Sequence, residues 1–169
     1  PELQGIMGGY LSQSQGFDKE IVEAIKEQYL PIGLDSIVPK KPFGITLSIS
    51  DKIDTLVGFF GTNQIPSSSK DPYALRRSAI GLLRIIIENN IIIRLKDLIS
   101  YGIRLFEDQG VKIENYKSEQ EILDFLKERM RNILKEKKII NEIIEASISS
   151  HLGDNYLDLF NKNVLINRY

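Results

Sequence analysis

The chain has 169 residues, of which 42 % are hydrophobic, and its 22 lysine and arginine residues against 23 aspartate and glutamate residues give a net charge of −1. This apolar content supports a packed core and excludes a disordered chain, while the balanced charge argues against a polybasic nucleic-acid binder and leaves room for a local basic patch. The absence of cysteine excludes disulfides and thiolate metal sites and is consistent with the reducing cytoplasm. No apolar run reaches the roughly 20 residues that are needed to cross a bilayer.

The first predicted elements are a loop and a short helix. Residues 1–17 hold four glycines without a helical period, so they are predicted to be a loop with a helical turn at residues 2–7. Asp18 is a candidate N-cap whose carboxylate can accept N–H groups of the first turn. The helix that it begins is predicted to run to about Tyr29 and to stop before Pro31.

Two longer helices follow. The first has an apolar stripe at helical spacing that ends near Gly61; a strand is the alternative for residues 45–50, where apolar and polar residues alternate. The second is predicted to begin with Asp71 as N-cap and Pro72 at the first helical position. The two stripes are Ile45, Ile49, Ile53, Leu56, Val57 and Phe60, then Leu75, Ala79, Leu82, Leu83 and Ile86.

The remainder of the sequence also predicts helices. One covers about residues 95–108, and Ser118 with Glu121 has the spacing of a capping box that opens another. One or two further helices are expected over about residues 139–161, broken near Gly153. The predicted fold class is therefore all-α, a multi-helix bundle.

Most catalytic signatures are missing. His151 is the single histidine, so no Ser-His-Asp triad can form, and neither a P-loop nor a dinucleotide-binding motif occurs. Asp51 and Asp54 lie three residues apart on one helix. Two interpretations are open: a solvated acidic stripe, or a pair of ligands for Mg²⁺ or Mn²⁺. Their spacing resembles the last helix motif of the HD phosphohydrolase superfamily, which also needs upstream histidines. Residues 1–50 contain none, so we expect no metal site, with Asp51 as a vestigial HD-type position.

Three ordered blocks resemble a known family. They are "PELQGIMGGY", "AIKEQYLP" and "SISDKIDTLVGFFGTNQIPSSSKDPYALRRSAIGLLRII", and together they are similar to the central segment of bacterial-type glycyl-tRNA synthetase β subunits. The departures are Ser50 and Ser78, where alanine is usual. Beyond residue 90 the similarity is one of helical pattern and length.

The resemblance implies a degenerate HD-like helical domain without a catalytic centre of its own. Because the chain begins at Pro1, we expect an internal fragment of a longer β chain, with 1–169 as one helical domain. Its parts would be a loop-rich entry (1–17), a family-matching core (18–109) and a less specific helical part (110–169). The resemblance further implies a cytoplasmic glycine–tRNA ligase whose partners are tRNA(Gly) and the α subunit. No cofactor is expected in this segment, because the α subunit would chiefly bind ATP and Mg²⁺.

The adjacent arginines Arg76 and Arg77 begin an apolar helix, and two interpretations stay open. Adjacent helical residues point about 100° apart, so the two side chains leave on different sides. In the structural interpretation they pair with carboxylates, with Arg76 as a strut. In the functional interpretation Arg77 and its neighbours contact tRNA phosphates, and Gly81 between Arg77 and Arg84 marks a close approach of a backbone or ligand. The ion-pair candidates are Arg76, Asp51, Asp54 and Asp71, and the RNA-binding candidates are Lys70, Arg77 and Arg84.

A second basic cluster and two alternative functions complete the predictions. The cluster is interleaved with Glu128 and Glu136 and is interpreted as a solvated helix face. The alternatives are a metal-dependent HD phosphohydrolase using Asp51, and a helical scaffold that docks on the α subunit through an exposed apolar surface near Phe59. The cluster consists of Lys127, Arg129, Arg131, Lys135, Lys137 and Lys138.

Overall fold

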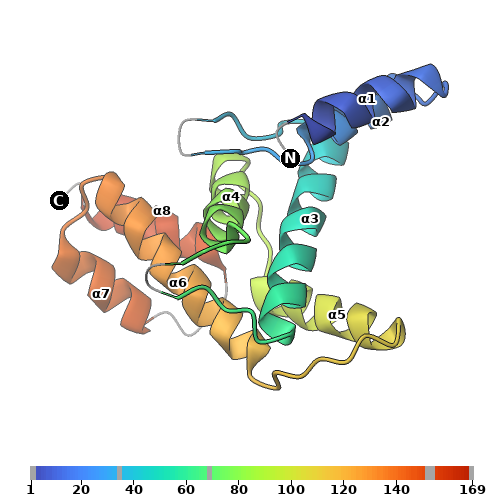
Figure 1. The fold of residues 1–169 in the computed structure, drawn as a ribbon. Coiled ribbons are helices and arrows are strands. Elements are labelled where there is room, and N and C mark those ends of the chain that lie inside the picture. The colour runs from blue at the N-terminus through green and yellow to red at the C-terminus, as the bar shows by residue number, and fades with distance from the viewer. Residues whose placement is uncertain (1–2, 34–35, 68–69, 151–154, 168–169) are drawn as a thin grey trace.

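The computed structural model describes residues 3–33, 36–67, 70–150 and 155–167 (Figure 1). These residues form eight α-helices and, within those ranges, no strand. The predicted all-α class is therefore confirmed, while the likeness to HD domains and the single-domain organisation stay predictions. None of the helices in the described ranges is long and apolar enough to cross a membrane.

Three helices make the centre of the core. α3 (Pro42–Gly61) packs against α4 (Leu75–Glu88) and α6 (Ser118–Glu136), and α4 also packs against α6. The predicted apolar stripes face this core, because residues three and four apart lie on one side of a helix. Among its fully buried side chains are Leu56, Phe60, Leu75, Leu82, Leu83, Ile86, Ile122 and Leu126.

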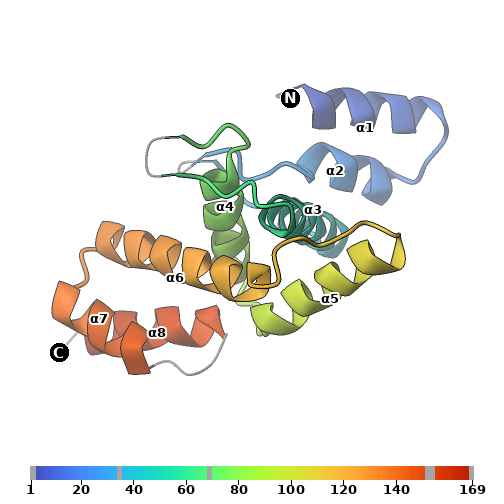
Figure 2. The same ribbon diagram turned by 60° about the horizontal axis from the view of Figure 1, so that its bottom comes forward.

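The remaining core helices cover two sides of this centre. α5 (Leu95–Asp108) packs on α3 and α6, whereas α7 (Asn141–Ser150) and α8 (Tyr156–Ile166) pack on α6, and α8 also on α4. Figures 1 and 2 show α5 and the α7–α8 pair on opposite sides of the molecule. The bounds predicted for α5 are confirmed, as are two helices after residue 139; the break predicted near Gly153 lies outside the described residues.

The prediction of a loop-rich entry over residues 1–17 is wrong. α1 (Gln4–Ser14) is a regular helix that packs against α2 (Lys19–Glu27). Its glycines allow the close contact: a Cβ on Gly5 would lie 2.8 Å from the carbonyl oxygen of Lys26. Packing against α2 therefore offsets the low helix propensity of glycine. α2 ends before the predicted Tyr29.

The structure confirms one predicted N-cap position without its side-chain bond and moves another. Asp18 is the N-cap of α2, but its side chain makes no capping hydrogen bond. α4 begins at Leu75 rather than at Pro72, and the Asp71 carboxylate accepts the N–H groups of Leu75 at 2.8 Å and Arg76 at 3.0 Å from outside the helix. The prediction of the start of α4 is thus wrong by about one turn, although Asp71 does satisfy first-turn donors.

The capping box predicted for α6 is also wrong. Ser118 is a buried helical residue, and Lys117 is the N-cap without a side-chain bond. Glu121 instead accepts a hydrogen bond from Asn115 Nδ2 at 2.7 Å, and Asn115 Oδ1 accepts the backbone N–H of Lys117 at 3.0 Å. A loop asparagine therefore orders the start of α6. By contrast, α3 extends without interruption over residues 45–50, so the helix rather than the strand is confirmed there.

Candidate functional site

The predicted acidic pair lies on α3 with a buried lysine between its members. Asp54 is exposed and Asp51 is half-buried, whereas Lys52 is only 4 % exposed. The Lys52 Nζ donates to Ser48 Oγ at 2.9 Å, and Ser48 Oγ donates to the Leu30 carbonyl oxygen at 2.6 Å. Burial lowers the pKa of Lys52 from 10.5 to about 8, and the negative charge of Asp51 opposes part of this shift.

Gly81 on α4 makes room for this lysine. A Cβ at Gly81 would lie 2.8 Å from Lys52 Cε and 3.4 Å from the Pro31 ring. Other groups do approach Gly81 closely, but they are two side chains, the Lys52 stem and the Pro31 ring, rather than the predicted backbone or ligand. The absence of a side chain at Gly81 lets α3, α4 and the segment after α2 meet around one cation.

A hollow opens beside Lys52. It has a volume of about 240 Å³, and an adjoining hollow of about 200 Å³ shares Pro31 and Arg77 with it. We call the two together the α3–α4 cleft. The first hollow is lined by Tyr29, Pro31, Ile32, Asp51, Lys52, Ala74, Arg77 and Ser78, and the second by Pro31, Gly33, Arg77, Ile80 and Gly81.

Asp51, which was predicted to be a vestigial HD-type position, lies in this cleft beside a hydrogen-bond donor and a cation. Its Oδ1 accepts a hydrogen bond from Gln28 Nε2 at 3.1 Å. Among the residues with described positions, no group of three or more His, Cys, Asp or Glu side chains could hold a metal ion. Lys52 follows Asp51 directly, so the cleft combines a carboxylate with a buried cation. This arrangement suits hydrogen bonding and charge recognition.

The three ion-pair candidates for Arg76 have different surroundings. Asp71 Oδ2 lies 3.9 Å from Arg76 Nη1, and Arg76 Nη2 donates to the Ser67 carbonyl oxygen. Asp51 and Asp54 form no salt bridge with any described residue. Arg76 therefore ties the start of α4 to the preceding loop rather than to α3.

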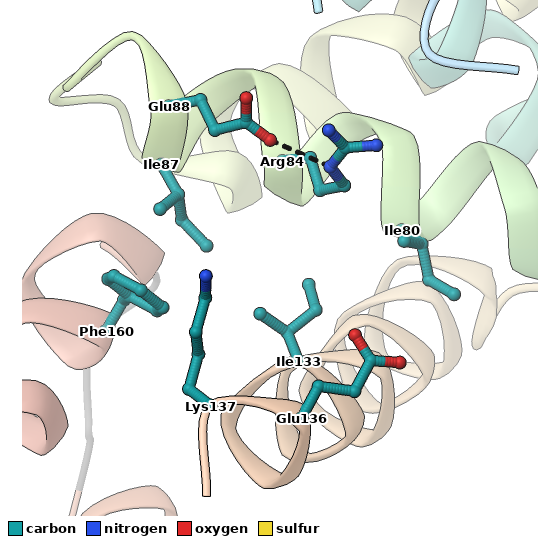
Figure 3. Close-up of a pocket in the computed structure, with 8 residues that line it drawn as sticks. All are labelled: Ile80, Arg84, Ile87, Glu88, Ile133, Glu136, Lys137 and Phe160. Atoms are coloured by element: carbon teal, nitrogen blue, oxygen red, sulfur yellow. Dashed lines mark hydrogen bonds and ion pairs between the residues drawn. The ribbon is translucent and has the colours of Figure 1, made fainter. Parts of the chain in front are cut away.

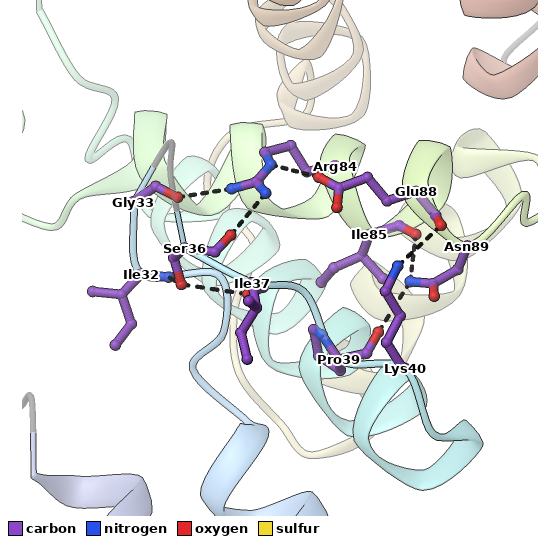
Figure 4. A network of polar contacts seen from close by, with 10 residues as sticks. All are labelled: Ile32, Gly33, Ser36, Ile37, Pro39, Lys40, Arg84, Ile85, Glu88 and Asn89. Carbon is purple, nitrogen blue, oxygen red and sulfur yellow. Dashed lines mark hydrogen bonds and ion pairs between the residues drawn. The ribbon is translucent and has the colours of Figure 1, made fainter.

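Arg84 is held by a polar network (Figure 4). Its Nη1 donates to the Gly33 carbonyl oxygen at 2.8 Å, its Nη2 to the Ser36 carbonyl oxygen at 2.7 Å, and its Nε to Glu88 Oε1 at 2.8 Å. The side chain is 16 % exposed. All three guanidinium nitrogens are thus engaged within the chain, which ties the segment before α3 to α4.

Two residues that the sequence did not single out extend this network. Asn89 Nδ2 donates to the carbonyl oxygens of Pro39 at 3.1 Å and Ile85 at 2.9 Å. Lys40 Nζ donates to the carbonyl oxygen of Glu88 at 3.1 Å (Figure 4). Both side chains bind carbonyl groups at the end of α4, where four carbonyls lack helical partners. The network meets the α3–α4 cleft only at Gly33, which accepts from Arg84 and lines the second hollow.

Arg77 and Lys70 are placed differently from Arg84. Both are exposed, and the side chain of neither makes a hydrogen bond or ion pair with the rest of the described chain. Arg77 lines both hollows of the α3–α4 cleft. Of the three RNA-binding candidates, Arg77 thus has an unengaged guanidinium at a concave surface, and Lys70 precedes α4 in the adjoining loop.

Two other expectations concern the surface. Phe59 stacks on Tyr73, with ring centroids 4.1 Å apart, so the apolar surface expected there is partly covered. In the second basic cluster, Arg129 is 5 % exposed, so the interpretation as a solvated face is wrong for this residue. Its guanidinium carbon lies 4.2 Å from the centroid of the Phe125 ring, where a cation–π contact helps to hold it.

A further cavity of about 240 Å³ lies between α4, α6 and α8 (Figure 3). Figure 3 shows the Lys137 side chain extending between Phe160 and Ile133, with its nitrogen directed toward Ile87. The charged residues Arg84 and Glu88 on its wall are paired with one another. We assign no chemistry to this cavity, because its remaining lining is mainly apolar packing between helices.

Comparison with known proteins gives a consistent result. The family model described as the glycyl-tRNA synthetase beta subunit matches residues 1–149. A glycine–tRNA ligase beta subunit of Acinetobacter baumannii (strain AYE) is 40 % identical over 146 residues, which cover 86 % of this chain and 21 % of that protein.

Relatives from other bacteria agree. The glycine–tRNA ligase beta subunit of Rickettsia canadensis (strain McKiel) is 42 % identical over 150 residues, covering 87 % of this chain and 22 % of that protein. That of Dichelobacter nodosus (strain VCS1703A) is 38 % identical over 159 residues, covering 94 % of this chain and 22 % of that protein. The chain thus spans about a fifth of the length of these relatives.

Proposed function

Because the chain belongs to the glycyl-tRNA synthetase beta subunit family, we propose that it is a helical segment of a cytoplasmic glycine–tRNA ligase and helps to position tRNA(Gly). In this proposal the α subunit attaches glycine with ATP and Mg²⁺, and the segment has no catalytic centre of its own. The α3–α4 cleft contributes binding energy to a tRNA that is also held elsewhere in the enzyme.

The observation that carries the proposal is the guanidinium of Arg77. It lies at both hollows of the cleft and makes no hydrogen bond or ion pair with the described chain. A guanidinium is suited to a phosphate group, because its N–H donors form a planar fork that matches two phosphate oxygens. Lys70 supplies a second exposed cation nearby in sequence, and Lys52 adds positive charge at the wall of the cleft.

The test is the kinetics of the ligase assembled from the complete β chain and the α subunit. We expect Arg77→Ala to raise the KM for tRNA(Gly) about five- to tenfold, which corresponds to roughly 1–1.4 kcal/mol, and to leave kcat nearly unchanged. The reason is that Arg77 would bind tRNA equally in the ground and transition states. Arg104→Ala is the control, because it removes the same charge from an exposed position on α5.

Two outcomes would contradict the tRNA contact. One is an unchanged KM for tRNA in Arg77→Ala, and the other is an equal increase in Arg104→Ala. Salt dependence gives a second criterion, because a lost phosphate contact also lowers the dependence of tRNA affinity on salt concentration.

A second candidate, docking on the α subunit, is favoured by the outer face of α1. Five large apolar side chains, four on α1 and one at its N-cap, are exposed, and in the described chain α1 packs chiefly on α2. The relatives are named as beta subunits, which supports a second type of subunit as the partner. Met7→Asp should then weaken α–β association in sedimentation experiments, while unchanged association would exclude this face. The five side chains are Leu3, Ile6, Met7, Tyr10 and Leu11.

A further inference from the structure

A polar hollow lies between α4 and α6, outside the α3–α4 cleft. Its volume is about 420 Å³, enough for a phosphate group with part of its substituent. Arg76 enters it from α4, and Arg129 and Asn132 enter it from α6. It is lined by Pro66, Arg76, Ile80, Phe125, Glu128, Arg129 and Asn132.

Arg129 is a buried cation whose hydrogen bonding is incomplete. It is 5 % exposed, and its buried Nε has no hydrogen-bond partner in the described chain. Its one ion pair joins Nη1 to Glu128 Oε2 at 3.0 Å, and the Glu128 side chain is 62 % exposed. Buried charges are normally paired and hydrogen-bonded, because desolvation is costly. A single, largely solvated carboxylate leaves Arg129 with donor capacity to spare.

The other two polar side chains are also suited to an anion. The Arg76 guanidinium holds Asp71 only at 3.9 Å and donates one bond to Ser67. Asn132 is exposed and follows Arg129 by three residues, so its amide lies on the same side of α6. Two guanidinium groups from different helices and an amide therefore line one space. The Phe125 ring packs against the Arg129 guanidinium group.

We propose that this hollow, which we call the Arg76–Arg129 site, binds a phosphate group. The phosphate would take hydrogen bonds from both guanidinium groups and from the Asn132 amide, and Glu128 would move into solvent as the anion replaces it beside Arg129. The phosphate can belong to a nucleic-acid backbone or be free in solution. The site does not depend on the proposed function, because it uses Arg76 and α6 instead of Arg77 and the α3–α4 cleft.

The experiment follows arginine Nε–Hε signals in ¹H–¹⁵N NMR spectra of the labelled chain during titration with inorganic phosphate. Chloride at matched ionic strength is the reference. We expect millimolar binding that shifts the Arg76 and Arg129 signals, which are assigned with Arg76→Lys and Arg129→Lys. Arg129→Met should weaken binding at least about tenfold while its apolar side chain still covers Phe125. Arg131→Met is the control, because Arg131 instead pairs with Glu145.

Two further variants keep the test decisive. Asn132→Ala changes an exposed residue and should weaken phosphate binding severalfold even if Arg129→Met fails to fold. Glu128→Gln should tighten binding severalfold, because it removes the competing carboxylate; a purely structural Arg129–Glu128 pair would not produce this gain. Phosphate shifts no larger than those of chloride, unchanged binding in Asn132→Ala, or weaker binding in Glu128→Gln would each overturn the proposal.

Titration with tRNA distinguishes the two sources of phosphate. Shifts of the Arg129 signal that need a severalfold higher tRNA concentration in Asn132→Ala identify a nucleic-acid phosphate, whereas a response to inorganic phosphate alone identifies a free phosphate. The failure of this site is separable from failure of the tRNA proposal, because the latter is measured through Arg77 and the KM for tRNA.

Discussion

Arg77 and Arg84 lie two turns apart on α4, yet their guanidinium groups have different surroundings. Arg84 donates from all three nitrogens to Gly33, Ser36 and Glu88. Arg77 makes no such bond in the described chain and lines the α3–α4 cleft. The difference arises because the carbonyl groups of Gly33 and Ser36, in the segment between α2 and α3, lie beside Arg84 and accept its hydrogen bonds. One arginine therefore stabilises the fold, and the other is available to a ligand.

The largest effect should come from removing the engaged arginine. Arg84→Ala should lower the free energy of unfolding by about 3–4 kcal/mol, because hydrogen bonds to charged groups contribute roughly 1.5–3 kcal/mol each and do not add fully. Urea denaturation measures this loss. Arg84→Lys should recover less than half of it, since one ammonium cannot replace the guanidinium fork. A loss below about 1 kcal/mol would mean that the network of Figure 4 does not hold the segment to α4.

The second-largest effect concerns Lys52, the buried cation that lines the α3–α4 cleft together with Arg77. The pKa of Lys52 is lowered from 10.5 to about 8 in the folded chain, so between these values the unfolded chain binds more protons. The Lys52 contribution to the free energy of unfolding therefore rises with pH across this window, by about 2–3 kcal/mol in total. Below pH 8 both states hold the proton and the cost of the buried charge is constant.

Lys52→Met isolates this contribution. The difference in unfolding free energy between Lys52→Met and the unchanged chain should be largest near pH 7 and shrink by about 2–3 kcal/mol by pH 10.5. Urea denaturation at several pH values measures it, and the comparison cancels other groups that titrate in both proteins. A difference independent of pH would show that Lys52 keeps its ordinary pKa in the folded chain.

The sequence predicted those elements whose pattern is local and missed those that depend on distant partners. The apolar spacing predicted α3 and α5, because burial of one face decides both helices. α1 was missed because its glycines lower the helix propensity of the segment. The packing against α2 that offsets this cost depends on a neighbouring helix and leaves no local pattern. Two of the three partners of Arg84, Gly33 and Ser36, lie 51 and 48 residues away in the chain, and no local period reveals them.

The two buried cations did have a signal in the sequence. Lys52 lies three residues after Ile49 and four before Leu56, on the apolar stripe of α3. Arg129 likewise lies three residues after Leu126 and four before Ile133 on α6. A charged residue within an apolar stripe indicates burial. The charged neighbours of each residue indicate a solvated surface instead, so the charge pattern and the apolar period give opposite indications at both positions.

Gly81, which lies between the two arginines, should give an effect of about 1 kcal/mol. Gly81→Ala gains helix propensity of roughly 0.5–1 kcal/mol, but its Cβ would lie 2.8 Å from Lys52 Cε. We therefore expect a net loss of about 1 kcal/mol in the unchanged chain and a net gain in a Lys52→Ala background. A double-mutant cycle by urea denaturation measures this coupling. Additive effects would show that Lys52 moves aside without cost.

The smallest effect is expected at Arg77, and it decides whether the comparison holds. Arg77→Ala should change the free energy of unfolding by less than about 0.5 kcal/mol, because an exposed side chain without partners contributes little and alanine has the higher helix propensity. Urea denaturation of Arg77→Ala and Arg84→Ala under the same conditions measures the contribution of each arginine to the free energy of unfolding. A loss at Arg77 of more than about 1 kcal/mol would show that the fold also uses this arginine. A higher KM for tRNA in Arg77→Ala would then have a structural explanation, so near-neutral stability is required before that increase can be assigned to a phosphate contact.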